Sequence, residues 1–309
     1  MKTFLRSDGR RLRIVPGFRD RVLASRSSVT PRPDWTETQY TAAVERKVER
    51  AARLPAAISR WRGALDGAVV LDVGCGDGVN CLAIALQPVE RVVGIDLELP
   101  LFASGEQGAQ TRRLVGRVLE RLDHGSGLDQ ALTRLPVSLA AMDAATMAFP
   151  DDSFDVLLSR SALEHMTPVE RALAEMARVV RAGGLIHHSI DPYFWVRGCH
   201  KRGLVDVPWA HARLSLEDFR RLVTDTEGEA TAAKRCRRLQ TLNRFTLARW
   251  RALITAGPLE VLEWREEPTA LAVSLLQEHP EVTETLLDGV EARDLVHGRI
   301  EAWLRVTKR

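Results

Sequence analysis

A glycine-rich turn between a buried strand and a helix most limits what this chain can fold into. Val69–Val73 is rich in β-branched residues, which is typical of a strand buried on both faces of a parallel sheet. Gly74, Gly76 and Gly78 follow it, and Asn80–Leu86 is predicted to be a helix. Glycines let the backbone turn sharply and approach a ligand, and the start of a helix offers unpaired N–H groups. The segment therefore predicts a ligand site at the carboxyl end of this strand.

The next strand adds a carboxylate to this site. Arg91–Asp96 ends on an acid that lies 20 residues after Gly76. A carboxylate there can accept hydrogen bonds from both hydroxyls of a ribose, which predicts an adenosine-type ligand over the strand ends. A dinucleotide fold favours glycine or alanine at Val79, and a P-loop needs lysine after Gly78. Neither pattern is met, and a glycine turn without a ligand stays open as the alternative.

The rest of the chain predicts how this site is built into a fold. Strands expected at Val137–Met142, Phe154–Ser159 and Leu185–Ile190 alternate with helices expected at Phe102–Asp123 and Thr167–Arg181. This alternation predicts an α/β fold with a parallel sheet covered on both faces. Outside it we expect helices at Thr36–Leu54 and Ala56–Leu65, a strand at Leu259–Arg265 and an edge strand at Arg299–Thr307.

Four segments follow from these patterns. Residues 1–65 are expected to form an N-terminal arm and helical lid, and residues 66–190 the ligand-binding core. Residues 191–256 are expected to be a helical insertion that covers the active site, and residues 257–309 the strands that complete the sheet.

Charge and composition exclude several classes of protein. A net charge of +3 over 309 residues does not indicate a nucleic-acid binder, and no apolar run is long enough for a membrane span. The four cysteines have no zinc-site spacing, so we expect reduced thiols, no metal and a cytoplasmic location. The first 26 residues carry a local charge of +6. Their interspersed apolar residues favour an arm packed on the protein over an organellar transit peptide.

Leu71–Gly78 and Val92–Asp96 together resemble the class I S-adenosylmethionine (SAM)-dependent methyltransferases, in the small-molecule branch that includes quinone-biosynthesis enzymes. Later segments of the family pattern follow in order, at Met142–Ala144, Phe149–Ser159, Ser161–Met166 and Ala177–Leu185. The resemblance covers about residues 66–190 and, weakly, the final strands. It implies a doubly wound, seven-stranded Rossmann-like sheet, SAM as cofactor, and methyl transfer to an O or N atom of a small-molecule acceptor, such as a natural product or a sugar-like compound.

The resemblance also implies roles for cofactor-binding residues. The methionine end of SAM would be lined by Asp72, Gly74, Cys75 and Gly76, with Asp72 holding the ammonium directly or through solvent. The ribose would be held by Asp96 and Leu97, the adenine by Asp143 and Ala144, and Ser159 would close the site near the sulfonium. Asp77 stands where the family more often has Thr or Ser, and could cap the helix. We also expect Tyr40 or Trp35 to lie beside the cofactor, with simple core packing as the alternative.

Histidines concentrate where an acceptor would bind, because five of the eight lie between His165 and His211. Methyl transfer to a hydroxyl needs a group that accepts the proton, and His188 and His165 are the expected bases. Asp191 and Tyr193 follow the same strand and are further catalytic candidates. Strand alternation puts His187 and His188 on opposite faces, so that one can face the cleft while the other is packed.

Three other functions stay open. They are a tRNA or rRNA methyltransferase, a SAM-using enzyme that does not methylate (such as a cyclase that releases methylthioadenosine), and a SAM-binding regulatory module without turnover. The basic run Lys234–Arg238 favours a solvated helix face over a nucleic-acid surface, because the aromatic residues lie elsewhere. We therefore expect a small-molecule partner, no nucleic acid and no membrane span, and leave a homodimer open.

Overall fold

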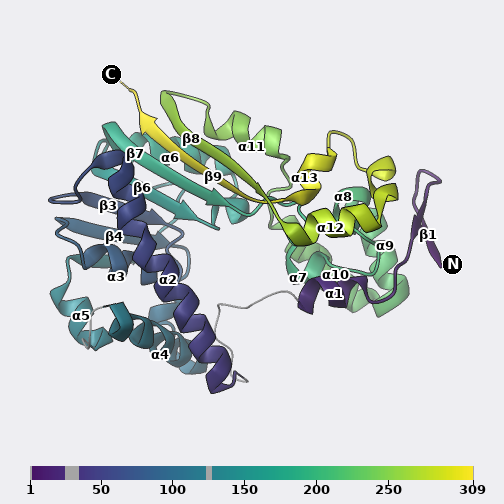
Figure 1. The fold of residues 1–309 in the computed structure, drawn as a ribbon, viewed down its shortest axis with the longest axis horizontal. Helices are drawn as coiled ribbons and strands as arrows, with labels where there is room; N and C mark the ends of the chain where they lie inside the picture. Colours follow the sequence, from purple (N-terminus) through teal and green to yellow (C-terminus); the bar gives the residue numbers. More distant parts are fainter. Residues whose placement is uncertain (1, 25–34, 123–126, 309) are drawn as a thin grey trace.

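The computed structural model describes residues 2–24, 35–122 and 127–308 and shows two lobes lying side by side (Figure 1). The larger lobe is built on a seven-stranded sheet with the order β5-β4-β3-β6-β7-β9-β8. Its parallel strands are β3 (Val69–Val73), β4 (Arg91–Asp96), β5 (Val137–Ala141), β6 (Phe154–Arg160) and β7 (Val180–Ile190). β8 (Leu259–Pro268) and β9 (His297–Val306) are antiparallel to their neighbours.

Helices cover both faces of this sheet, as the alternation along the chain predicts. On one face, α2 (Glu37–Arg62) and α3 (Val79–Ala85) bury side chains against Val70 and Val92. On the other face, α6 (Val169–Val179) and α11 (Leu247–Ile254) pack against the opposite side chains of the same strands. Helices α4 (Gly105–Leu122) and α5 (Leu128–Arg134) pack on α2 and α3. The doubly wound α/β fold is confirmed by this arrangement.

Two expected elements differ from the structure. One continuous helix, α2, replaces the two helices expected at Thr36–Leu54 and Ala56–Leu65, although Pro55 lies inside it. Leu54 and Ile58, on either side of the proline, are buried in the same core, and this burial offsets the lost backbone hydrogen bond. β9 is an inner strand and β8 is the edge strand, because β9 buries side chains on both of its faces.

The smaller lobe gathers three separate parts of the chain around one hydrophobic core (Figure 1). The N-terminal part supplies β1 (Thr3–Leu5), β2 (Arg11–Arg13) and α1 (Phe18–Ala24). The middle part supplies α7 (His200–Gly203), α8 (Ala210–Arg213), α9 (Leu216–Glu227) and α10 (Glu229–Gln240). The C-terminal part supplies α12 (Ala270–Glu278), η3 (Pro280–Thr285) and α13 (Ala292–Val296). The helical segment expected at 191–256 therefore shares its core with both ends of the chain. No helix among these described residues is long and apolar enough to cross a membrane.

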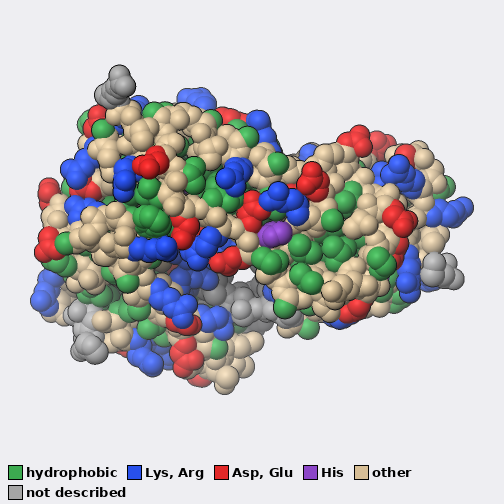
Figure 2. All heavy atoms as spheres, turned by 45° about the horizontal axis from the view of Figure 1, so that its top comes forward, with side chains coloured by type: hydrophobic (Ala, Val, Ile, Leu, Met, Phe, Trp, Pro, Cys, Tyr) green, Lys and Arg blue, Asp and Glu red, His purple; other side chains and the backbone are tan. Residues whose placement is uncertain are grey.

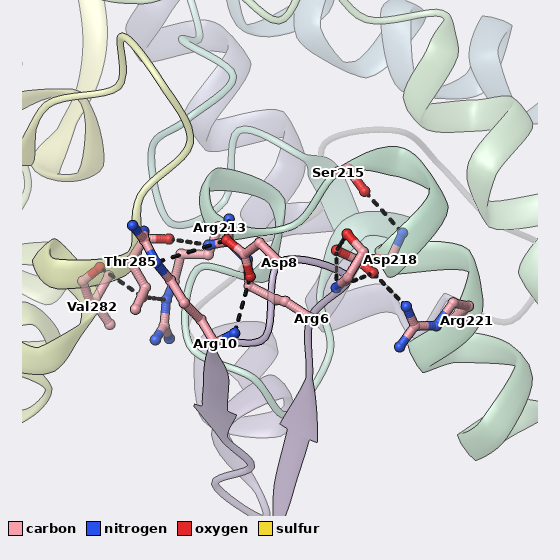
Figure 3. Close-up of polar contacts among 10 residues, drawn as sticks. Arg6, Asp8, Arg10, Arg213, Ser215, Asp218, Arg221, Val282 and Thr285 are labelled. Atoms are coloured by element: carbon pink, nitrogen blue, oxygen red, sulfur yellow. Dashed lines mark hydrogen bonds and ion pairs between the residues drawn. The ribbon is translucent and has the colours of Figure 1, made fainter.

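The N-terminal hairpin is fastened to this lobe by buried polar contacts (Figure 3). Asp218 is 2% exposed and accepts hydrogen bonds from the Ser7 backbone N–H at 3.1 Å and from the Ser7 hydroxyl at 3.0 Å. Arg6 donates to the Thr285 carbonyl at 2.6 Å, and the buried Arg213 donates to the Thr285 hydroxyl at 2.7 Å. The arm thus packs on the protein, as its apolar residues predict.

Replacing Asp218 by alanine is expected to lower the free energy of unfolding by about 2 kcal/mol, because the Ser7 backbone N–H and hydroxyl lose a buried, charged acceptor. Chemical denaturation of the variant measures this loss. The matched control is Asp225→Ala, which removes an exposed carboxylate from the same helix. Equal stability of the two variants would show that the hairpin contributes nothing through Asp218.

Candidate functional site

A cavity of about 830 Å³ opens at the carboxyl ends of four adjacent parallel strands. Its lining comes from the loop Gly74–Asp77 after β3, Asp96 and Leu97 after β4, residues 142–145 after β5, and residues 160–162 after β6. We call it the strand-end cavity. Ligands of open α/β sheets bind at this edge, and the volume lies within the roughly 300–1,000 Å³ typical of small-molecule sites.

The glycine loop and Asp96 hold each other in place. Gly74 has a φ of +78°, and a Cβ added to it would lie 2.3 Å from the Cβ of Ala162. Only glycine fits at this position. The Gly74 N–H donates to the Ile95 carbonyl at 2.8 Å, and the Gly76 N–H donates to Asp96 Oδ2 at 2.9 Å. These two hydrogen bonds hold the loop against the carboxyl end of β4.

Most of the expected cofactor residues line this cavity. They are Gly74, Cys75, Gly76, Asp96, Leu97, Asp143 and Ala144. Asp143 accepts a hydrogen bond from the Ala145 N–H at 2.8 Å, which orients its carboxylate. Leu97 is 71% exposed, so an apolar side chain stands at the rim. The cavity thus combines carboxylates with glycine backbone and apolar surface.

Three expected cofactor residues lie outside the cavity lining. Tyr40 is 2% exposed; its hydroxyl donates to the Gln110 carbonyl at 2.8 Å, and its ring meets Trp35 edge-on. For both aromatic residues the core-packing alternative holds. Ser159 is fully buried in β6, and the next residues, Arg160 and Ser161, line the cavity in its place.

Asp72 is the third of these residues, and it is buried in β3. Its Oδ2 accepts a hydrogen bond from Cys81 Sγ at 3.5 Å, while its Oδ1 has no hydrogen-bond partner among the described residues. Burial raises the pKa of this carboxyl to about 6. Because Asp72 does not line the cavity, it acts on a ligand there only through its charge or through an intervening group.

The raised pKa makes Asp72→Asn a stabilising substitution at high pH. The folded protein binds this proton more tightly than the unfolded chain, so ionisation above pH 6 costs stability, and the cost fades as the pH falls from 6 toward 3.8. Thermal unfolding should show a gain of about 2 kcal/mol at pH 8 and little gain at pH 4. Asp66→Asn, at an exposed position before the same strand, is the control. A gain independent of pH would contradict the assignment.

Three expected catalytic residues lie outside the lining of the strand-end cavity. His188 is 1% exposed and lines a different cavity of about 480 Å³ beneath the sheet, between α6 and α11. Its side of β7 faces these helices, because it shares that side with Ile186 and Ile190. Tyr193 is buried in the core of the smaller lobe against His211. Asp191 does not line the strand-end cavity, and its carboxylate forms an ion pair with Arg299 at 3.1 Å.

His165 is the one expected base that lines the strand-end cavity. Its ring stacks on His200 of the smaller lobe, with centroids 5.1 Å apart and an interplanar angle of 20°. Burial, aided by the charge of Arg238, lowers the pKa of His165 below 6.5. The imidazole is therefore neutral near pH 7 and able to accept a proton.

Sequence reasoning missed the polar residues that α2, α4 and α10 bring to the cavity. They are Lys47 and Arg50 from α2, Gln107 and Thr111 from α4, and Gln240 and Thr241 from the end of α10. Lys47 forms an ion pair with Asp77 Oδ2 at 2.6 Å, while Asp77 Oδ1 accepts a hydrogen bond at 3.4 Å from the N–H of Val79, the first residue of α3. The three-residue spacing of Lys47 and Arg50 puts both side chains on one side of α2. This spacing is the feature of the sequence that could have identified them as cavity residues.

The order of the strands and the glycine loop with its acid define a nucleoside-binding α/β domain. Residues 71–187 match the family described as "Methyltransferase domain". This part of the chain is therefore similar to methyltransferase domains.

The chain is also similar to individual proteins named as methyltransferases. The chain is 32% identical to ajmaline N-methyltransferase of Rauvolfia serpentina, over 40% of this chain and 38% of that protein. It is 27% identical to a ubiquinone/menaquinone biosynthesis C-methyltransferase of Geobacter sulfurreducens, over 53% of this chain and 56% of that protein. A SAM-dependent methyltransferase from Mesorhizobium loti is similar with a TM-score of 0.47, 16% identity, and 84% and 99% of the two chains covered. The chain spans about half or less of the length of the curated relatives it matches.

Proposed function

We propose that this protein transfers a methyl group from SAM to an O or N atom of a small-molecule acceptor. The observation that carries the proposal is the strand-end cavity, in which a glycine loop fixed by Asp96 lies beside a neutral histidine. The match of residues 71–187 to a methyltransferase domain supports the same reaction. We further propose that it acts in the cytoplasm, in keeping with four buried cysteines that are all free thiols.

The residues in the cavity fit SAM. Gly74, Cys75 and Gly76 line the part of the cavity that we propose for the methionine end, and a Cβ on Gly74 would collide with Ala162. Asp96 keeps carboxylate lone pairs free for the ribose hydroxyls while it holds the loop. Asp143 and Ala144, after β5, are positioned for the adenine. SAM, when bound, supplies a methyl group made electrophilic by a sulfonium.

The acceptor is proposed to enter where the two lobes meet. There His165 lines the cavity together with Gln240 and Thr241, which come from the smaller lobe. The two lobes would exclude water and align the nucleophile with the methyl group. His165 takes the proton as the new bond to the methyl carbon forms and the bond from that carbon to sulfur breaks.

Calorimetric titration of the purified protein with SAM and S-adenosylhomocysteine tests the cofactor, with NAD as the control. Micromolar binding of the first two and none of NAD is the expected result. Incubation with SAM and a panel of phenols, carboxylic acids and amines then tests the reaction, read out as S-adenosylhomocysteine. Release of methylthioadenosine would indicate a non-methylating enzyme. Absence of SAM and S-adenosylhomocysteine binding would overturn the proposal.

A further inference from the structure

Two arginine side chains in the strand-end cavity have no anionic partner. Arg50 comes from α2 and Arg160 from the end of β6, and both line the cavity. Neither guanidinium group makes a hydrogen bond or an ion pair with any residue in the described part of the chain. Burial lowers the pKa of both groups, and for Arg160 the charge of Arg50 adds to this effect. Both guanidinium groups remain charged at neutral pH.

Of the carboxylates that act on these two groups, Asp72 is buried outside the cavity lining and three others are paired with other cations. Asp77 pairs with Lys47 at 2.6 Å, Asp191 with Arg299 at 3.1 Å, and Glu301 with Arg265 at 3.1 Å. Each of these acids contributes at a distance to the field at Arg50 or Arg160, but none lies within ion-pair range of either. The charge of Arg50 disfavours the charge of Arg160, and a bound anion would offset this repulsion.

Strand order separates this cationic end from the acidic end of the cavity. Asp143 follows β5 and Asp96 follows β4, on one side of β3, whereas Arg160 follows β6 on the other side. Figure 2 shows Lys and Arg side chains on the sheet lobe where the two lobes meet, interspersed with Asp and Glu side chains. The nucleoside and the anion-binding groups therefore belong to opposite ends of the same cavity.

We propose that Arg50 and Arg160 form an oxyanion site, and that the acceptor carries a carboxylate or phosphate group that binds there beside the carboxylate of SAM. SAM brings a single carboxylate, and its ammonium and sulfonium bring no further anion. Two guanidinium groups line the cavity without an ion pair to any described residue, so that one of them is left for the acceptor. Guanidinium binds both kinds of oxyanion through paired N–H donors. This inference rests on the proposed function and narrows its substrate to an anionic small molecule.

The test is a titration of the protein saturated with S-adenosylhomocysteine, using inorganic phosphate in one arm and benzoate in the other. The variants are Arg50→Gln and Arg160→Gln. The matched control is Arg53→Gln, which removes an exposed arginine from the same helix outside the cavity. We expect at least one probe to bind. At least one cavity variant should weaken that probe tenfold or more while keeping its affinity for S-adenosylhomocysteine within threefold.

The two arms distinguish a phosphate from a carboxylate acceptor. Failure of both probes to bind the saturated protein, or equal probe affinity in all three variants and the parent protein, overturns the inference and leaves the methyltransferase proposal intact. A third outcome is that both cavity variants lose affinity for S-adenosylhomocysteine while their affinity for the probe does not change independently. This outcome assigns both arginines to the cofactor and also overturns the inference. Failure of the parent protein to bind S-adenosylhomocysteine overturns the proposed function and this inference together.

Discussion

Replacement of Asp96 by alanine is expected to weaken binding of S-adenosylhomocysteine by two to three orders of magnitude. Two hydrogen bonds from ribose hydroxyls to a carboxylate contribute roughly 1.5–3 kcal/mol each, so their loss is large even after partial compensation by water. The same carboxylate accepts the Gly76 N–H at 2.9 Å, and its removal also frees the glycine loop. Calorimetric titration of the variant measures the affinity.

Its control is Glu98→Ala, which removes an exposed acid two residues further along the chain. That variant should bind with the affinity of the parent protein. Asp96→Asn keeps one acceptor oxygen and should fall between the two. An affinity of Asp96→Ala within twofold of the parent protein would show that Asp96 does not hold the ribose.

The residues of the glycine loop and its acid could be predicted from sequence because they are local. Gly74, Gly76 and Asp96 occupy fixed places relative to the ends of two strands, and parallel strands bring those ends to one edge. Asp143 follows from the same rule, applied to the strand next to β4. Such positions need only the strand boundaries and the handedness of the crossovers.

The acceptor end could not be predicted in this way, because it depends on packing between distant segments. Strand alternation correctly placed His187 and His188 on opposite faces, but nothing local shows which face meets a cavity, and His188 faces α6 and α11. Arg50 lies on a helix that precedes the sheet, and Gln240 comes from the other lobe. The smaller lobe itself joins residues more than 200 positions apart, such as Ser7 and Asp218.

Replacement of His165 by glutamine is expected to lower kcat/KM for a hydroxyl acceptor by two to four orders of magnitude, the usual contribution of a positioned general base. Affinity for S-adenosylhomocysteine should stay within threefold, because the imidazole is assigned to the acceptor and not to the cofactor. The measurement is the initial rate of S-adenosylhomocysteine release with an acceptor found in the screen, together with titration of the cofactor product.

The pH profile separates a base from a residue that only shapes the cavity. The neutral imidazole is the active form, and burial lowers the pKa of His165 below 6.5. In the parent protein kcat/KM should therefore stay level above pH 6.5 and fall only as the pH drops through that lowered pKa. His165→Gln should lose this acid limb along with the rate, whereas His297→Gln, outside the strand-end cavity, should keep both. If kcat/KM of His165→Gln still falls at low pH as it does in the parent protein, another group accepts the proton, even if the variant is slower.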